Sequence, residues 1–200
     1  MQPSKGDARP DKIENESSEE GQTMATEQAT PTKTELLAAL RSSAREVQAK
    51  LGERPAETFE EGRYENGWSG RQIFAHVASI EWTYPRLIDI AKQAAAPSPE
   101  KPGRDEPEQS DQPPTRTMRG GVDDYNQRQV EKRAQASVAE LLAEFKKNRT
   151  ATIAAVEQLD EALLATPIRS AGGISGTLGS VIQMVAVAHV LGHVSDIVGD

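Results

Sequence analysis

Residues 188–200 read AHVLGHVSDIVGD, which places two histidines four positions apart in a stretch that is otherwise almost wholly apolar. Side chains four apart on an α-helix lie on one face, with Cβ atoms about 5–6 Å apart, so His189 and His193 can point to one centre. That face is expected to turn inward, because the residues on the same side in the preceding turns are apolar: Ile182, Val185 and Ala186.

The third and last histidine, His76, lies in the segment NGWSGRQIFAHVASIEW at residues 66–82. It falls between Ile73 and Ile80 on the apolar face of the helix predicted there. Three inward imidazoles on two helices of a bundle suit a divalent ion such as zinc, nickel, copper or iron. Three protein ligands leave at least one coordination position open, as in catalytic rather than structural sites.

The same pattern has a plainer interpretation, in which each histidine is a core residue hydrogen-bonded to a backbone carbonyl. The metalloprotease signature H-E-x-x-H is absent, because Val190 follows His189. Burying three unpaired imidazoles would however cost several kcal/mol, which favours a ligand role. Asp196 shares the face of His189 and His193, and three roles are open to it. It could be a fourth metal ligand, an acceptor that fixes the tautomer of a ligating histidine, or a carboxylate that faces water.

Helical periodicity predicts four helical segments and no strand. The first covers about residues 33–51, and the second starts at Ser69 and is kinked or split by Pro85. The third covers about residues 122–159 in two parts, and the fourth, which begins at Thr177 or Leu178 and ends near Val198, is apolar nearly all round. Three pairs have capping-box spacing and mark helix starts: Thr32 with Glu35, Ser69 with Gln72, and Ser137 with Glu140. The predicted fold is therefore an all-α four-helix bundle over residues 31–199.

Two segments lie outside this helical pattern. Residues 1–30 are polar and acidic, so we expect a disordered tail, and they lack the basic start and apolar core of a signal peptide. Residues from about 94 to 121 hold half of the 12 prolines. They are interpreted as a flexible insertion in the bundle, which is either a variable loop or a lid over a site.

Composition narrows the classes of function. The formal net charge of −8 argues against a nucleic-acid partner, which requires basic patches. The absence of cysteine excludes disulfides and a cysteine nucleophile and agrees with a reducing cytoplasm, so any thiol chemistry needs an external thiol. The dense apolar run at residues 181–191 is too short to cross a bilayer and favours a core helix, so no membrane association is predicted.

Three stretches, taken in order, resemble the DinB/YfiT-like superfamily of four-helix bundles. Residues 66–82 resemble its W-S-x-R-x-x-x-A-H pattern. Residues 122–149 (VDDYNQRQVEKRAQASVAELLAEFKKNR) resemble its D-x-x-N segment followed by a capped helix with arginine. Residues 188–198 resemble its closing H-x-x-x-H.

The resemblance implies an up-down-down-up topology and a divalent metal held by His76, His189 and His193. The superfamily includes thiol-dependent transferases and isomerases that use mycothiol, bacillithiol or glutathione, and hydrolases that open electrophilic small molecules. The mycothiol-dependent maleylpyruvate isomerase branch resembles this chain over the bundle, but no second domain is evident here.

Three further residues occupy family-like positions. Trp68 is expected to be a hydrophobic staple before the Ser69 cap. Asn126 either forms a hydrogen bond across the bundle or faces the pocket. Arg133 either binds an anionic substrate or lies on a solvated helix face, and the solvated face is favoured.

The leading hypothesis is a metal-dependent enzyme acting on a small molecule, using zinc, nickel or iron and an external low-molecular-weight thiol or water. It would be a thiol transferase or isomerase, or a hydrolase of an electrophilic compound. No general base is evident in the sequence. The alternatives are a non-catalytic bundle that sequesters a small molecule, and a purely structural helical protein. No surface pattern decides the oligomeric state, which leaves a homodimer open.

Overall fold

The computed structural model describes residues 29–63, 67–96 and 121–199, and these form a helical bundle with one small hairpin. Most of the predicted tail (1–30) and of the predicted insertion (94–121) lies outside the described residues. The α-helices are α1 (Lys33–Leu51), α2 (Gly70–Ile80), α3 (Pro85–Ala95), α4 (Gly121–Glu131), α5 (Val138–Glu157), α6 (Leu178–Ile182) and α7 (His189–Val198). Short 3-10 helices are η1 (Ala56–Phe59), η2 (Glu81–Thr83) and η3 (Glu161–Ala165), and η4 (Gln183–Ala188) is a π-helix joining α6 to α7.

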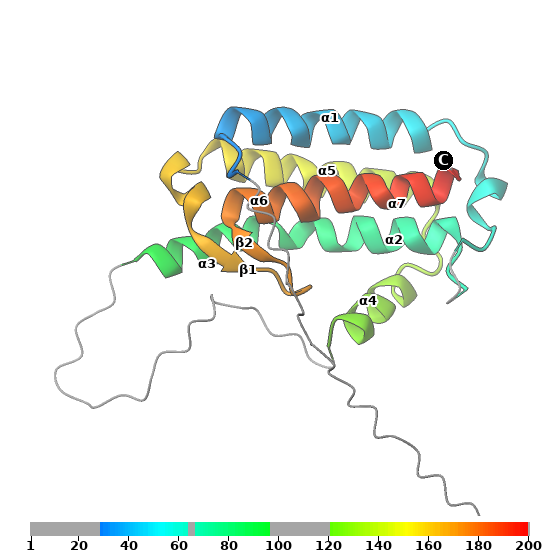
Figure 1. The fold of residues 1–200 in the computed structure, drawn as a ribbon. Coiled ribbons are helices and arrows are strands. Elements are labelled where there is room, and N and C mark those ends of the chain that lie inside the picture. The colour runs from blue at the N-terminus through cyan, green and yellow to red at the C-terminus, as the bar shows by residue number, and fades with distance from the viewer. Residues whose placement is uncertain (1–28, 64–66, 97–120, 200) are drawn as a thin grey trace, which may run out of the picture.

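The bundle has the predicted up-down-down-up topology (Figure 1). Helices α1 and α7 run in one direction, and α2 and α5 run in the opposite direction. Around the bundle, α1 packs against α5, α5 against α2, α2 against α7, and α7 against α1. Helix α4 lies outside this square and packs on α2. The all-α four-helix prediction is therefore confirmed.

The helix starts follow the sequence signals. All three predicted capping boxes form, at Thr32, Ser69 and Ser137, and in each the cap side chain and the residue three positions later satisfy each other's backbone N–H. Pro85 splits the second helical segment as predicted. It occupies the first turn of α3, where its missing N–H costs nothing, and η2 makes the join to α2.

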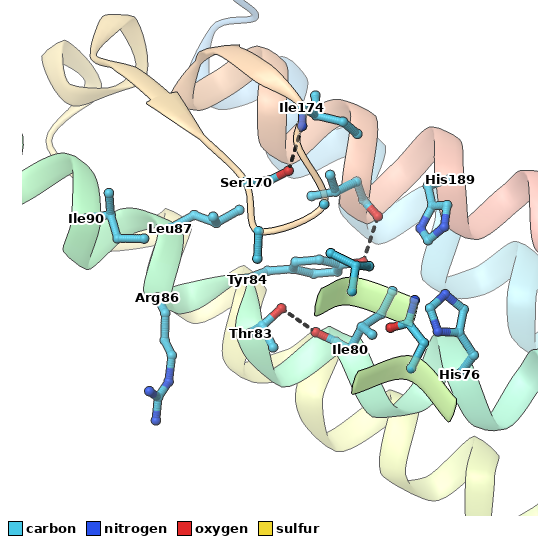
Figure 2. Close-up of a pocket in the computed structure, with 15 residues that line it drawn as sticks. His76, Ile80, Thr83, Tyr84, Arg86, Leu87, Ile90, Ser170, Ile174 and His189 are labelled. Carbon is cyan, nitrogen blue, oxygen red and sulfur yellow. Dashed lines mark hydrogen bonds between the residues drawn. The ribbon is translucent and has the colours of Figure 1, made fainter. Parts of the chain in front are cut away.

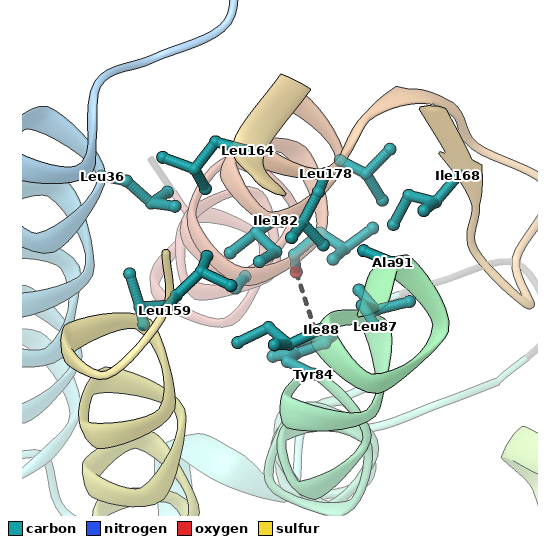
Figure 3. Close-up of a cluster of buried hydrophobic side chains, with 14 of the residues drawn as sticks. Leu36, Tyr84, Leu87, Ile88, Ala91, Leu159, Leu164, Ile168, Leu178 and Ile182 are labelled. Atoms are coloured by element: carbon teal, nitrogen blue, oxygen red, sulfur yellow. Dashed lines mark hydrogen bonds between the residues drawn. The ribbon is translucent and has the colours of Figure 1, made fainter. Parts of the chain in front are cut away.

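The core consists of two clusters of buried side chains along the bundle. One lies at the end where α3, α6 and the end of α5 meet α1, and it includes Leu36, Tyr84, Ile88, Leu159 and Ile182 (Figure 3). The other lies between α2, α5 and α7. Its members include Phe59, Phe74, Phe145, Val190 and Ile197. The histidine face of the bundle borders this second cluster.

A β-hairpin, which the sequence pattern did not predict, connects η3 to α6. Strands β1 (Pro167–Arg169) and β2 (Ser175–Thr177) pair antiparallel, with Ile168 opposite Gly176. Each strand has only three residues, which is too short for polar–apolar alternation to be seen. Gly173, at φ +88°, makes the tight turn between them. The expectation of no strand was therefore wrong.

The last helical segment runs without a break from Leu178 to Val198, close to its predicted bounds. Its mean hydropathy of 1.6 and its length would allow it to cross a membrane on those two criteria. In the structure one face of this segment is buried in the bundle through Leu178, Ile182, Ala186 and Val190. That packing agrees with the interpretation of this segment as a core helix.

A buried ion pair joins four parts of the bundle. Arg149 of α5 is 1% exposed and Glu81 of η2 is 0% exposed. The guanidinium donates from Nε and Nη2 to the two carboxylate oxygens of Glu81, at 2.6 and 2.9 Å. It also donates to the Leu40 carbonyl and Ser43 Oγ of α1, at 3.2 and 2.6 Å, and to the Ala186 carbonyl of η4, at 2.6 Å. Burial raises the pKa of Glu81, and the guanidinium opposes that rise.

Removing one member of this pair leaves an uncompensated buried charge. We expect Glu81→Ala to lower the free energy of unfolding by about 3–5 kcal/mol, measured by urea denaturation. The matched control is Glu157→Ala, which removes the exposed ion pair with Arg41 and should cost no more than about 1 kcal/mol. Equal losses in the two variants would show that the buried pair contributes no more than a surface pair.

Candidate functional site

The three histidines converge between α2 and α7, which pack side by side. The Ser69 cap starts α2, and His76 lies two helical turns later on the face toward α7. His189 and His193 lie on the first and second turns of α7, on one face as their spacing predicts. The ring centroid of His76 is 5.6 Å from that of His189 and 5.2 Å from that of His193. Residues more than a hundred positions apart in the chain thus form one cluster.

The ring nitrogens of the cluster have the spacing of a ligand set. One nitrogen from each of the three histidines lies within 4.8 Å of those of the other two. The Nε2 atoms of His189 and His193 are 2.9 Å apart. Two nitrogens bound to one tetrahedral zinc at 2.0–2.1 Å are separated by about 3.3 Å, a few tenths of an ångström more than the His189–His193 distance.

Asp196 orients one ring of the cluster. Its Oδ2 lies 3.3 Å from His193 Nδ1, and its carboxylate is partly exposed at the end of α7. A proton on Nδ1 that is donated to this carboxylate leaves the Nε2 lone pair of His193 facing the cluster. Of the three roles left open by the sequence, this contact matches that of the acceptor that fixes a histidine tautomer.

One buried polar atom at the site has no hydrogen-bond partner. His76 is 6% exposed, and its Nδ1 is buried without a partner among the described residues. Native proteins rarely leave a buried ring nitrogen unpaired, because its desolvation costs about 1–3 kcal/mol. In the tautomer that carries its proton on Nε2, His76 Nδ1 has a free lone pair near two further imidazoles, which is suited to a cation.

Burial keeps the cluster neutral. Desolvation is the largest cause that lowers the pKa of His76, to about 3, and repulsion from His193 and His189 adds to it. Burial also lowers the pKa of His189 to about 4, against a small rise from its hydrogen bond to the Val185 carbonyl. The pKa of His193 is lowered by burial and partly restored by Asp196. Neutral imidazole is the form that binds metals.

The π-helix places His189. In η4 the Val185 carbonyl accepts a hydrogen bond from the buried Tyr84 hydroxyl at 2.7 Å, and the next carbonyl, of Ala186, accepts from Arg149. Two side chains from outside the helix therefore hold carbonyls of the turn that ends where α7 begins. Single π-helical turns inside α-helices are frequent at functional sites, and η4 leads directly into His189.

A pocket of about 260 Å³ opens beside the cluster (Figure 2). His76 and His189 form one end of it, and Tyr84 and Ile80 lie in the middle. The far wall comes from Leu87 and Ile90 of α3 and from the hairpin turn 170–174, and α4, which packs on the His76 helix α2, contributes Val122 and Asn126. Helices α2, α3, α4 and α7 together with the hairpin build a cavity that leads to the histidines.

A family model matches a part of the sequence that includes the histidine site. The model of the DinB superfamily matches residues 50–197, which include all three histidines. The chain belongs to the DinB superfamily. No curated protein matches it.

Two crystal structures share the fold of this DinB chain at low sequence identity. One is a mutant of the mycothiol-dependent maleylpyruvate isomerase, with a TM-score of 0.60 and 14% identity, covering 84% of this chain and 61% of that one. The other is the colibactin self-resistance protein ClbS in complex with a dsDNA, with a TM-score of 0.59 and 16% identity, covering 84% and 95%. The chain thus spans about three fifths of the isomerase structure.

These likenesses bear on the predicted partners. One neighbour is an enzyme of small-molecule chemistry by its name, and the other was crystallised with duplex DNA. The predicted absence of a nucleic-acid partner is therefore not supported by the comparisons, although the net charge of −8 remains unfavourable for one.

The three family-like residues have distinct surroundings in the DinB chain. Trp68 packs on the second core cluster, and its ring also lies 5.7 Å from that of His76, while its role as a staple stays a prediction. Asn126 of α4 lines the pocket. Arg133 does not line the pocket, and its partly buried guanidinium makes a two-point bond with Glu144, at 2.9 and 2.5 Å, across the turn between α4 and α5. The favoured solvated role of Arg133 was wrong.

Sequence reasoning did not single out Glu81, Arg149 or Tyr84. A signal exists for the first two, since Glu81 follows Ile73 and Val77 at four-residue spacing and Arg149 follows Phe145 in the same way. Both charges therefore occupy positions where an apolar residue is expected. No signal identifies the hairpin turn as a pocket wall.

The lowered histidine pKa values predict acid sensitivity of the metal-free protein. Below about pH 6.5 the unfolded chain binds protons that the folded histidines do not, so the free energy of unfolding falls as the pH drops toward 4. Each such histidine contributes at most about 1.4 kcal/mol per pH unit. The measurement is urea denaturation of chelator-treated protein at pH 7, 6 and 5.

The control for this prediction is His76→Gln, which removes one of the titrating groups. The stability difference between wild type and this variant should shrink as the pH falls, because only the wild type loses stability through His76. A difference that stays constant from pH 7 to 5 would contradict the prediction.

Proposed function

We propose that this DinB chain binds one divalent metal ion through His76, His189 and His193 and acts as a metal-dependent enzyme on a small molecule. The observation that carries the proposal is the unpartnered, buried Nδ1 of His76 within a cluster of three neutral imidazoles. A purely structural role would leave that atom unsatisfied, whereas a cation gives it a partner. The donor set suits zinc, nickel and iron alike.

The chain supplies orientation and access around this centre. A bound divalent ion would supply Lewis acidity and lower the pKa of a water or thiol that reaches it. Asp196 holds the His193 ring in one tautomer, and the η4 carbonyls hold the turn that leads into His189. The adjoining pocket admits a small molecule to the open side of His76 and His189.

The proposed reaction class rests on two points, the absence of cysteine from the sequence and the likeness of the fold to a thiol-dependent isomerase. With no cysteine in the sequence, a thiol would come from an external low-molecular-weight compound. The likeness to a mycothiol-dependent isomerase supports thiol transfer or isomerisation, and the alternative is hydrolysis of an electrophile. A cytoplasmic location would supply such thiols.

A second candidate function is non-catalytic sequestration of a small molecule. It is favoured by one observation: no Asp, Glu, Lys or Cys is among the described residues that line the pocket. The pocket therefore offers no carboxylate general base, and binding alone would not need one. The likeness to a self-resistance protein is compatible with this function.

Protein purified without an affinity tag is expected to contain about one zinc, nickel or iron per chain by elemental analysis. Its His189→Ala variant should retain less than about a tenth of that metal while keeping its helical circular dichroism. Ile90→Ala serves as a control, because it changes the α3 wall of the pocket without removing a ligand or a hydrogen bond that positions one, and it should keep the metal. A wild-type protein without stoichiometric metal would overturn the proposal.

Turnover separates the enzyme from the sequestering protein. Metal-loaded protein is incubated with glutathione or mycothiol and excess electrophile, and product is counted per protein molecule. Many products per chain support an enzyme, and at most one per chain supports sequestration.

The contact between Asp196 and His193 gives a further prediction. Asp196→Asn is expected to weaken metal affinity by about tenfold, the lower end of the usual range for partners of metal ligands, because this carboxylate is partly exposed. Asp89→Asn, on the exposed side of α3, should leave the affinity unchanged. The affinities are measured by competition with a chromophoric chelator, and equal values for the two variants would exclude a role for Asp196.

A further inference from the structure

The pocket beside the histidines is apolar over most of its wall. Side chains without hydrogen-bonding groups come from α2, α3, α4, the hairpin and η4, and they surround the space between the histidines and Leu87 (Figure 2). They are Ile80, Leu87, Ile90, Val122, Ile174 and Val185. A substrate that fills this part gains by burying apolar surface. Its volume of about 260 Å³ lies just below the usual range of ligand pockets, about 300–1,000 Å³, and so suits a small molecule.

The hydroxyl groups around this wall are already engaged with the protein. Tyr84 donates to the Val185 carbonyl and Thr83 donates to the Ile80 carbonyl, both at 2.7 Å. Ser170 Oγ accepts from the Ile174 backbone N–H at 3.1 Å and holds the hairpin turn. Tyr84 and Thr83 therefore have no proton left to donate to a substrate, whereas the Ser170 hydroxyl, which accepts in its contact, keeps its proton.

The apolar part of the pocket also lacks a counter-charge. Among the described lining residues, the ionisable ones are His76, His189, Tyr84 and Arg86. Burial keeps Tyr84 neutral by raising its pKa. The guanidinium of Arg86 lies over the Trp82 ring at 4.6 Å and points away from the histidines (Figure 2). A charged group on the body of a substrate would therefore leave water for an apolar wall without meeting a counter-charge among the described lining residues.

Asn126 is the exception among the polar lining residues. Its amide forms no hydrogen bond with any described residue, although the side chain is partly buried and lines the same pocket as His76 and His189. An amide side chain offers two donors and one acceptor oxygen. It can therefore pair with a substrate group placed at the histidine end of the pocket.

We propose that the site takes a small substrate with an uncharged, apolar body and one polar end, a carbonyl or amide group that Asn126 recognises beside the histidines. This rests on the proposed function, because it assigns a substrate class to the same site. In this proposal Asn126 is a specificity-determining residue. The apolar wall formed by α3 and the hairpin selects against substrates with a charged body.

The test uses linear amides as probes of the full-length protein, with binding followed by NMR titration. Hexanamide should bind roughly tenfold more tightly than butanamide, because two further methylenes enter the apolar wall. The matched compound 6-aminohexanamide, which has an ammonium at its tail, should bind at least tenfold more weakly than hexanamide. Equal affinities within either pair would overturn the apolar-body assignment.

The role of Asn126 is tested by Asn126→Leu, which keeps the side-chain size and removes the amide. Hexanamide affinity should fall about tenfold, as expected for the loss of one to two hydrogen bonds. The control Gln135→Leu makes the same chemical change at an exposed position outside the pocket and should leave affinity unchanged. No loss in Asn126→Leu would overturn the assignment, and should that variant not fold, Asn126→Ser replaces it.

Each titration is run on chelator-treated and on zinc-loaded protein, so that the two proposals fail separately. Binding of hexanamide with the expected tail dependence, in a protein that retains no metal, would overturn the metal site and support the pocket assignment. Stoichiometric metal in a protein that binds hexanamide and 6-aminohexanamide equally would support the metal site and overturn the pocket assignment.

Discussion

The arrangement of the bundle depends on one buried guanidinium. Arg149 has no access to water, so each of its donors must find an acceptor within the protein, and α1, η2 and η4 supply them. The aromatic ring of Phe145, 4.9 Å from the guanidinium carbon, closes the remaining side. A misplaced helix would leave a charge unsatisfied in the core, and this requirement restricts how these four elements can pack.

The hydrogen bonds of Arg149 also fix the elements that carry the histidine cluster. The acceptor in η4 is the Ala186 carbonyl, and the neighbouring Val185 carbonyl is held by Tyr84, so the helix is clamped just before His189. Glu81, the partner of Arg149, continues the helix that carries His76. Both halves of the site are therefore anchored to one ion pair, which explains how side chains from distant segments can hold a fixed spacing without a covalent link.

The polar groups of this region divide into two kinds. Most are satisfied by the protein itself, as the hydroxyls of Tyr84 and Thr83 are by backbone carbonyls. A few are not: besides Tyr125 Oη on α4, these are His76 Nδ1, which is buried without a partner among the described residues, and the Asn126 amide, which is only partly buried and lines the same pocket. Unsatisfied groups in an otherwise satisfied core are the places where a protein meets something other than itself. His76 and Asn126 belong to one cavity, which gives the DinB scaffold of this chain a defined site.

Local signals in the sequence determined the helices and their inward faces. Capping boxes marked three helix starts, Pro85 marked a break, and the spacing of His189 and His193 placed them on one face. Only the tertiary structure decided that His76 faces them, that Glu81 and Arg149, 68 positions apart, form a pair, and that a hairpin walls the pocket. The physical reason is that periodicity reports which side of a helix is buried. The partner on that side is chosen by packing and charge across distant segments, which no local pattern records.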